Sequence, residues 1–278
     1  MSNHIEGKVI IVTGAASGFG RLVCQKAARL GARLACADID GSGLEEVVAQ
    51  ITSTGGNAFA CVTDVTDLKQ VQALAEKTLS AHQAIDVMIN NAGVMPLAFF
   101  SDHAEAADHW SRCIDINFKG VLHGCISVYD QMIRQGKGHI VNLSSIYGNY
   151  PVAGAGVYGA TKSAVNFLSE SLRIEARGKI KVTTVKPTGV PATNLGSGVV
   201  NREAVVGILG HNARPYFEQL QALTNGEGDP EQANPDSTAY LALEPEYIAD
   251  AIIATIDQPW GVATSDITVR ATGDGYIL

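Results

Sequence analysis

Residues 8–32, KVIIVTGAASGFGRLVCQKAARLGA, decide the fold. The run KVIIVT is almost continuously apolar, which is typical of a strand buried on both faces of a parallel sheet. The glycines of GAASGFG then allow a tight turn, and the apolar residues of RLVCQKAARLGA recur at helical spacing. This order of strand, glycine turn and helix predicts a site where free N–H groups at a helix N-terminus bind a pyrophosphate.

The same alternation continues along the rest of the chain. We expect further strands at residues 33–38, 57–65, 85–93, 139–144, 181–187 and 266–272. We expect helices at residues 44–55, 68–82, 104–135, 157–176, 213–224 and 245–257, the third of these interrupted near Asn117 and Gly120. Alternation at this spacing predicts an α/β fold, a doubly wound parallel sheet with helices on both faces. No composition break divides the chain, so we expect one domain over residues 1–278.

The composition fits a globular α/β protein, because 46% of the residues are hydrophobic, 17% are charged, and 29 glycines stand against 9 prolines. A net charge of −8 and the lack of Lys/Arg clusters argue against a nucleic-acid partner. No run approaches the roughly 18 apolar residues of a membrane span, and the first residues show no secretory signal pattern. Five cysteines without a CxxC pair predict free thiols in a reducing compartment, so we expect a cytoplasmic protein. The histidines form no ligand motif, and we expect no metal site.

Acidic residues follow the second and third strands. Asp38 ends the strand that begins at Arg33, where a carboxylate can accept hydrogen bonds from adenosine ribose hydroxyls and would repel a 2′-phosphate. Because no cation stands in the glycine turn or directly after Asp38, the sequence favours NAD over NADP. Asp64 and Val65 end the third strand, where they can meet the adenine ring, although Asp64 can equally approach the N-cap of the next helix.

A second group of polar residues lies in the stretch SSIYGNYPVAGAGVYGATK, residues 144–162. Tyr158 and Lys162 are four residues apart and therefore neighbours on one helical face. A phenol beside an ammonium becomes a useful acid or base near neutral pH, because the positive charge favours phenolate. Ser145 can reach the phenol if the chain folds back. Taken alone, the pattern also fits an ordinary exposed helix start.

The motifs TGAASGFG at Thr13 to Gly20, NNAG at Asn90 to Gly93 and YGATK at Tyr158 to Lys162 together resemble the short-chain dehydrogenase/reductase family. The resemblance covers nearly the whole chain. It implies a single-domain Rossmann-like fold with about seven parallel strands, and a homo-oligomer, commonly a dimer or tetramer, of which we favour the tetramer.

The resemblance also assigns roles to matching positions. Asn117 would hold a water in a proton relay, Ser145 would polarise the substrate oxygen, Tyr158 would be the general acid/base, and Lys162 would lower its pKa and bind the nicotinamide ribose. The implied cofactor, NAD, would contact the residues of the glycine turn, the strand ends and the motifs, namely Gly14, Ser17, Gly18, Phe19, Gly20, Asp38, Asp64, Val65, Asn91, Ala92, Gly93, Tyr158, Lys162, Pro187, Gly189, Val190 and Thr193.

The chain departs from the family pattern in two places. The family usually has Pro-Gly after the sixth strand, whereas here Thr188 separates Pro187 from Gly189. This places the local backbone in question, although Val190 still suits a backbone contact to the cofactor carboxamide. Phe19 replaces a small aliphatic residue in the glycine turn and should alter packing more than chemistry.

Residues 188–243 lose the regular pattern and form either a lid over the substrate or a plain surface excursion. We expect the substrate pocket to be largely apolar and aromatic, which favours an uncharged alcohol or ketone. The candidates for its lining are Met95, Pro96, Ser145, Ile146, Tyr147, Tyr150, Val152 and Leu195. His211, Arg214 and Arg202 could instead reach inward to a carboxylate.

Three functions remain open. The first is an NAD-dependent oxidoreductase that interconverts a secondary alcohol and a ketone by hydride transfer, acting on a small molecule with no nucleic-acid or membrane partner. The second is a redox sensor that binds the dinucleotide without turnover, although such a protein would be expected to lose part of the set Asn117, Ser145, Tyr158 and Lys162. The third is an NADP-dependent 3-hydroxy acid dehydrogenase, since the ending DITVRATGDGYIL resembles such a subgroup. Asp38 argues against the third.

Overall fold

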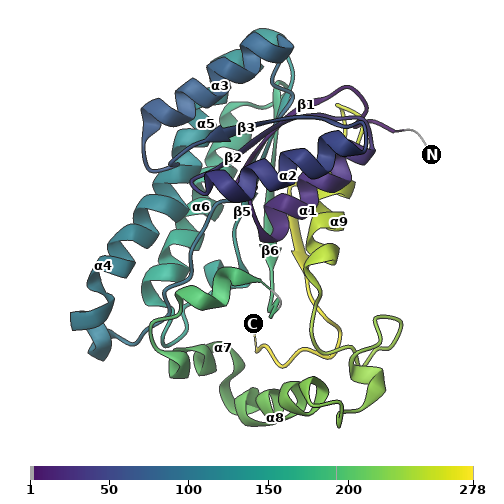
Figure 1. The fold of residues 1–278 in the computed structure, drawn as a ribbon. Coiled ribbons are helices and arrows are strands. Elements are labelled where there is room, and N and C mark those ends of the chain that lie inside the picture. Colours follow the sequence, from purple (N-terminus) through teal and green to yellow (C-terminus); the bar gives the residue numbers. More distant parts are fainter. Residues whose placement is uncertain (1–2, 192, 278) are drawn as a thin grey trace.

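The computed structural model describes residues 3–191 and 193–277 and has one seven-stranded sheet, in which all neighbouring strands are parallel (Figure 1). Its strand order is β3-β2-β1-β4-β5-β6-β7. The strands are β1 (Val9–Thr13), β2 (Arg33–Asp38), β3 (Asn57–Val62), β4 (Val87–Asn90), β5 (Gly138–Leu143), β6 (Ile180–Pro187) and β7 (Asp266–Val269). The order reverses between β1 and β4, and in open parallel sheets ligands bind beyond the carboxyl ends of the strands at such a point.

Helices cover both faces of the sheet (Figure 1). One face packs against α1 (Gly18–Arg29), α2 (Gly41–Ser53) and α9 (Pro245–Ile256), which share an apolar core with β1 and β2. The other face packs against α3 (Leu68–His82), α5 (Gly120–Gln135) and α6 (Gly156–Glu175). The helix α4 (His103–Ile114) precedes α5 and packs beside α6. The predicted doubly wound Rossmann-like sheet is thereby confirmed.

The predicted break near Asn117 is a π-helical turn, Asp115–Lys119, which joins α4 to α5. One extra residue in a helical turn changes the direction of the side chains after it, and such turns are frequent at functional sites. Here the turn leaves Asn117 fully buried.

The 188–243 segment lies beyond the carboxyl ends of the strands (Figure 1). It contains the short helix α7 (Val206–Leu209), the amphipathic helix α8 (Ala213–Thr224) and the 3-10 turns Asn194–Gly198, Arg202–Val205, Gly210–Asn212 and Pro230–Gln232. Its apolar side chains form a third core with Leu97, Tyr147 and Tyr158, so the segment packs directly against the end of the sheet that carries the polar motifs. In the part of the chain that the structure describes, no helix combines the length and apolar character that crossing a membrane requires.

Candidate functional site

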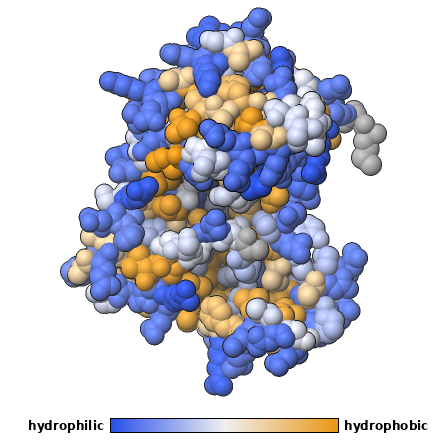
Figure 2. Space-filling view, in the orientation of Figure 1, coloured by the Kyte–Doolittle hydropathy of each residue, from blue (hydrophilic) through white to orange (hydrophobic). Residues whose placement is uncertain are grey.

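A cavity of about 1500 Å³ opens at the carboxyl ends of the strands. Its walls come from the loops after β1, β2, β3, β4, β5 and β6, from α4 and the π-helical turn that follows it, from the 188–243 segment and from Tyr276. Figure 2 shows the surface hollowed between the sheet part and the segment that faces it, with apolar side chains along the hollow. The wall of this one cavity therefore includes the glycine turn, Ser145, Tyr158 and Lys162.

The glycine turn has the conformation that its sequence predicts. Gly14 and Gly18 have φ angles of 66° and 50°, in the left-handed region that favours glycine. A Cβ at Gly20 would overlap the carbonyl oxygen of Gly14, so α1 can approach β1 this closely only through a glycine. Asn91 ties the turn to β4, because its Nδ2 donates to the carbonyl oxygens of Thr13 and Gly14 at 2.9 Å and 3.1 Å.

Asp38 lies at the end of β2 with its carboxylate on the cavity wall. Its Oδ2 accepts from Ala16 N at 3.0 Å and its Oδ1 from Asp40 N at 3.1 Å, so two backbone groups fix the carboxylate beside the glycine turn. Arg33 lies at the opposite end of β2, where its guanidinium donates to the Gly7 carbonyl.

Asp64 does not cap α3, since the N-cap of this helix is Asp67. Asp64 Oδ1 instead accepts from the backbone N and the hydroxyl of Thr66 at 2.9 Å and 2.7 Å, in a turn that faces the cavity. Val65 lies beside it, and its carbonyl is 2.9 Å from His123 Nδ1. Asp64 thus lies on the cavity wall, and its contact with the adenine ring stays a prediction.

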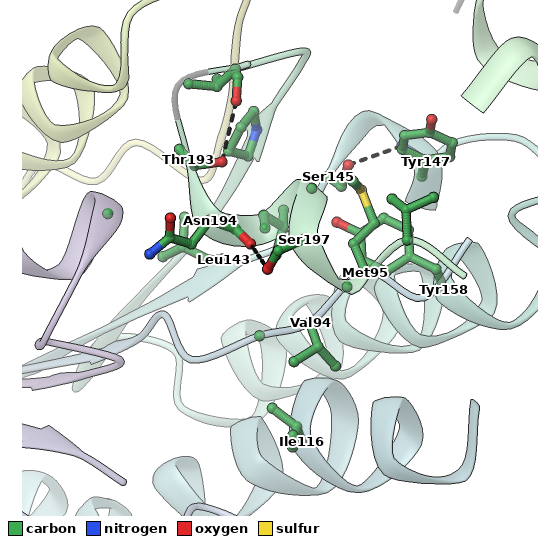
Figure 3. A pocket seen from close by; sticks show the side chains of 18 of the residues that line it. Val94, Met95, Ile116, Leu143, Ser145, Tyr147, Tyr158, Thr193, Asn194 and Ser197 are labelled. Atoms are coloured by element: carbon green, nitrogen blue, oxygen red, sulfur yellow. Dashed lines mark hydrogen bonds between the residues drawn. The ribbon is translucent and has the colours of Figure 1, made fainter. Parts of the chain in front are cut away.

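Ser145 and Tyr158 line the cavity close to each other (Figure 3). Ser145 caps a 3-10 turn and its Oγ accepts from Tyr147 N at 3.3 Å. The ring of Tyr147 meets that of Tyr158 edge to face, at 5.5 Å between centroids. Burial raises the pKa of Tyr158 above the ordinary phenol value, and the Ser145 hydroxyl opposes this by hydrogen bonding.

Lys162 is 5% exposed, and its Nζ donates to the Leu143 carbonyl at 2.8 Å. Burial lowers the pKa of Lys162 to about 8. Its Nζ lies 5.8 Å from the centroid of the Tyr158 ring and points to a backbone oxygen. In this arrangement burial has the largest effect on the pKa of Tyr158, and the lowering of that pKa by Lys162 stays a prediction.

Asn117 lies behind Lys162. A Cβ built on Gly93 would be 3.3 Å from Asn117 Oδ1 and 3.7 Å from Lys162 Nζ, so the NNAG glycine, the asparagine and the lysine meet at one point. Asn117 Nδ2 also lies 3.2 Å from the sulfur of Cys113 and 3.4 Å from the hydroxyl of Thr161. The amide is thus enclosed by α4, α6 and the NNAG loop.

Most of the predicted site residues line the cavity: Gly14, Ser17, Gly18, Phe19, Asp38, Asp64, Val65, Asn91, Ala92, Gly93, Met95, Ser145, Ile146, Tyr147, Tyr158, Lys162, Pro187, Gly189, Val190, Thr193, Leu195 and Arg202. Gly20 and Asn117 lie beneath this lining and support it. The predicted residues outside the lining are Pro96, Tyr150, Val152, His211 and Arg214.

Two of these residues show why a predicted residue can lie outside the lining. Tyr150 is 65% exposed, because the chain turns outward after the 3-10 turn Ile146–Gly148. Arg214 pairs with Glu218 on the outer side of α8, at 2.8 Å. Neither direction can be deduced from the spacing of residues in the sequence.

The residues of the cavity wall that the sequence interpretation missed include Thr188, Tyr216 and Tyr276. Thr188 Oγ1 is buried without a hydrogen-bond partner among the described residues. Tyr216 lies on α8, and Tyr276 is almost at the end of the chain. The aromatic residues in RPYFEQL and GDGYIL were the available signal. Within residues 3–191 and 193–277, no three His, Cys, Asp or Glu side chains are grouped to hold a metal ion.

Comparison with known proteins identifies the family. A family model described as short chain dehydrogenase matches residues 8–204. An uncharacterized oxidoreductase of Listeria monocytogenes is 33% identical over 275 residues, which cover 98% of this chain and 99% of the relative.

Two solved structures are similar over almost the whole chain. A short chain dehydrogenase/reductase from Burkholderia phymatum in complex with NAD is 27% identical with a TM-score of 0.75, and the match covers 96% of this chain and 90% of that one. A metagenomic short-chain oxidoreductase in complex with NADP is 27% identical with a TM-score of 0.73, covering 97% and 99%. The resemblance found in the sequence is confirmed, and the chain belongs to the short-chain dehydrogenase/reductase family of oxidoreductases.

Proposed function

We propose that the protein is an NAD-dependent oxidoreductase that interconverts a secondary alcohol and a ketone. The observation that carries this proposal is the shared cavity, in which Ser145 and Tyr158 lie at one end and the glycine turn with Asp38 lies at the other. A reacting alcohol at the first end and a dinucleotide extending to the second would both fit in about 1500 Å³.

The residues present fit a nicotinamide dinucleotide. Gly18 begins α1 and has open space where a Cβ would be, so backbone N–H groups at this helix start are free to approach a pyrophosphate. Asp38 would accept from ribose hydroxyls. When bound, the nicotinamide ring would supply the hydride acceptor or donor.

The cofactor would be NAD rather than NADP. Asp38 is held at the cavity wall by two backbone N–H groups, and the residues around it, Ser17, Gly18 and Ile39, carry no cation. A 2′-phosphate here would meet a carboxylate without compensation. Arg33, at the far end of β2, is engaged with the Gly7 carbonyl.

The chain's own residues would handle the proton on the substrate oxygen. Ser145 would donate a hydrogen bond to this oxygen where negative charge develops, and Tyr158 would take or give the proton. Because Lys162 and Asn117 converge on the space beside Gly93, they would connect the phenol to a proton relay behind it.

The substrate would be uncharged. Among the described residues that line the cavity, the cations are Lys162, Arg112 and Arg202. Lys162 is bound to a backbone carbonyl, and both arginines are exposed to water. Of these three, the buried one is therefore already bound to a backbone carbonyl and is not available to a substrate carboxylate, which argues against a 3-hydroxy acid.

The 188–243 segment would act as the lid of a single catalytic domain, because its Leu195 and α8 line the cavity opposite Ser145 and Tyr158. A homo-oligomer, preferentially a tetramer, is proposed from the exposed apolar side chains of Ile126 on α5 and Phe167 and Ile174 on α6. A cytoplasmic location is proposed from the five free cysteines.

The direct test is absorbance of reduced nicotinamide during incubation with secondary alcohols or ketones and either cofactor. Turnover of uncharged alcohols with NAD is expected. Tight cofactor binding without turnover of any alcohol or ketone would instead favour a redox sensor. Turnover only with NADP and hydroxy acids would favour an NADP-dependent 3-hydroxy acid dehydrogenase.

A further inference from the structure

Residues 270–277 bring Tyr276 to the wall of the cavity. After β7, residues 270–277 run back to the 188–243 segment (Figure 1). Ile277 N donates to the Ile208 carbonyl at 3.1 Å, and Asn212 Nδ2 donates to the Gly275 carbonyl at 3.0 Å. The tail, residues 270–277, is thus attached to the chain on both sides of Gly210.

An ion pair between a buried carboxylate and a partly exposed guanidinium fixes the shape of the tail. The Asp274 side chain is only 2% exposed, and its Oδ1 lies 2.6 Å from Arg270 Nη2. The same oxygen accepts from Tyr276 N at 3.3 Å. Since a carboxylate is buried this deeply only when it is paired and hydrogen-bonded, the turn before Tyr276 is a defined structure.

The turn places Tyr276 directly on the loop after β6. A Cβ at residue 189 would overlap the Tyr276 hydroxyl, although the φ angle of Gly189 is outside the left-handed region. Glycine is therefore required at 189 for space and not for backbone conformation. The Tyr276 phenol thus gives a reason for the glycine at 189, which Thr188 separates from Pro187.

Tyr276 belongs to a group of phenols from three elements. Its ring lies 5.6 Å from that of Tyr216 on α8, and the two hydroxyl oxygens are 3.3 Å apart. Tyr147, beside the catalytic candidate Tyr158, also lines the cavity, and its hydroxyl has no hydrogen-bond partner within residues 3–191 and 193–277. Burial, then the neighbouring Tyr216 and Tyr147, raise the pKa of Tyr276, so its phenol stays protonated at neutral pH.

We propose that Tyr276, positioned by Tyr216, determines specificity by binding, together with Tyr147, a second oxygen of the substrate. The substrate would then be an uncharged alcohol or ketone that carries a further hydroxyl or keto group beyond the reacting carbon. Neutral phenols suit this task, because each can both donate to and accept from a hydroxyl, and none attracts a carboxylate as a cation would. The inference rests on the proposed alcohol and ketone chemistry.

The test compares cyclohexanol with 1,2-, 1,3- and 1,4-cyclohexanediol in dead-end complexes with the reduced cofactor, where no turnover occurs. Dissociation constants come from the change in nicotinamide fluorescence. We expect the wild type to bind at least one diol about tenfold more tightly than cyclohexanol, as one added hydrogen bond allows. Tyr276→Phe should abolish this preference and leave the affinity for cyclohexanol within about twofold.

Tyr129→Phe is the matched control, since Tyr129 lies on α5 in the opposite core, away from the cavity. It should keep the full preference. Equal binding of cyclohexanol and all diols by the wild type would overturn the inference without any variant, as would an unchanged preference in Tyr276→Phe. In both cases cyclohexanol binding would leave the proposed function standing. A complex with reduced cofactor that binds none of these alcohols would overturn both.

Discussion

Asn117 holds both polar groups of the Val94 backbone: its Oδ1 accepts from Val94 N at 2.9 Å, and its Nδ2 donates to Val94 O at 2.8 Å. An amide side chain thus takes the place of a neighbouring strand just after the NNAG motif. Because this pair of hydrogen bonds fixes the loop that faces Lys162, Asn117 has a structural task in addition to any part in proton transfer.

Replacing Asn117 by Leu should lower the free energy of unfolding by about 1–3 kcal/mol, because two partly buried backbone groups lose their partner. Urea unfolding of the cofactor-free protein measures this. Asn149→Ala, at an exposed position, is the control and should change stability by less than about 0.5 kcal/mol. Equal effects of the two substitutions would contradict the structural task.

Tyr158→Phe should reduce kcat by about 10²- to 10⁴-fold, because the substrate oxygen loses its acid or base. Cofactor affinity should change little, since the ring and its contact with Tyr147 remain. Steady-state rates and cofactor titration together check this. Near-normal turnover in the variant would refute the assigned role.

Asp38→Ala should weaken NAD binding about tenfold and relax discrimination against NADP, because a hydrogen-bond acceptor and a repulsive charge are removed together. The substitution also frees Ala16 N and Asp40 N. Asp38→Asn therefore serves as the matched variant, which removes the charge and retains one acceptor oxygen. If the ratio of NAD to NADP affinity stays constant in both variants, the ribose assignment is wrong.

Lys162 should add to the stability of the cofactor-free protein a contribution that rises with pH above about 8. The buried thiols of Cys24, Cys113 and Cys125 add one that falls, because their pKa is raised, in Cys24 by a hydrogen bond to Cys36 and in all three by burial. Burial lowers the pKa of Lys162 to about 8, whereas an unfolded lysine titrates near 10.4. Between these values the unfolded chain binds more protons, so the free energy of unfolding increases with pH, by at most about 1.4 kcal/mol per unit from this group.

Urea unfolding between about pH 7.5 and 9.5 tests this expectation through the difference between wild type and Lys162→Met, which should grow with pH in favour of the wild type. The contributions of the thiols and of Lys8, whose pKa burial lowers to about 8 at the other end of the sheet, are common to both proteins and cancel in this difference. A slope identical to that of the wild type would show that Lys162 titrates normally.

Gly189→Ala should displace Tyr276 and raise KM for the preferred substrate, because the new methyl group occupies the place of the phenol oxygen. Adding Tyr276→Ala removes the collision. The double variant should therefore have a KM no higher, and a free energy of unfolding no lower, than Tyr276→Ala alone. Kinetics and unfolding of the three variants complete the cycle. Additive losses would mean that residue 189 needs glycine for another reason.

The sequence predicts the sheet well because its strands are nearly continuous apolar runs, such as VIIVT in β1, and because glycines mark the turn that follows. Even the break in the long helix near Asn117 could be predicted, since it appears as a local change in pattern. These are properties of neighbouring residues. Predicting them does not require knowing which distant parts of the chain come into contact after folding.

The far wall of the cavity could not be predicted in the same way. Tyr276 contacts Gly189 although 86 residues lie between them in the sequence, and no periodicity connects the two positions. Tyr150 shows the opposite case, because it adjoins the motif in sequence but points to solvent. The pKa of Tyr158 likewise depends on how deeply the folded chain encloses it, which spacing alone does not reveal.

The two ends of the described chain have different surroundings, and this matters for how the protein is handled. Asn3 contacts Leu30 near the amino ends of the strands, whereas Ile277 is bonded to Ile208 beside the cavity. A fluorescent label attached at Ile277 would therefore lie next to the tail that holds Tyr276. A label attached at Asn3 would lie at the opposite ends of the strands, so labels for binding or kinetic work belong there.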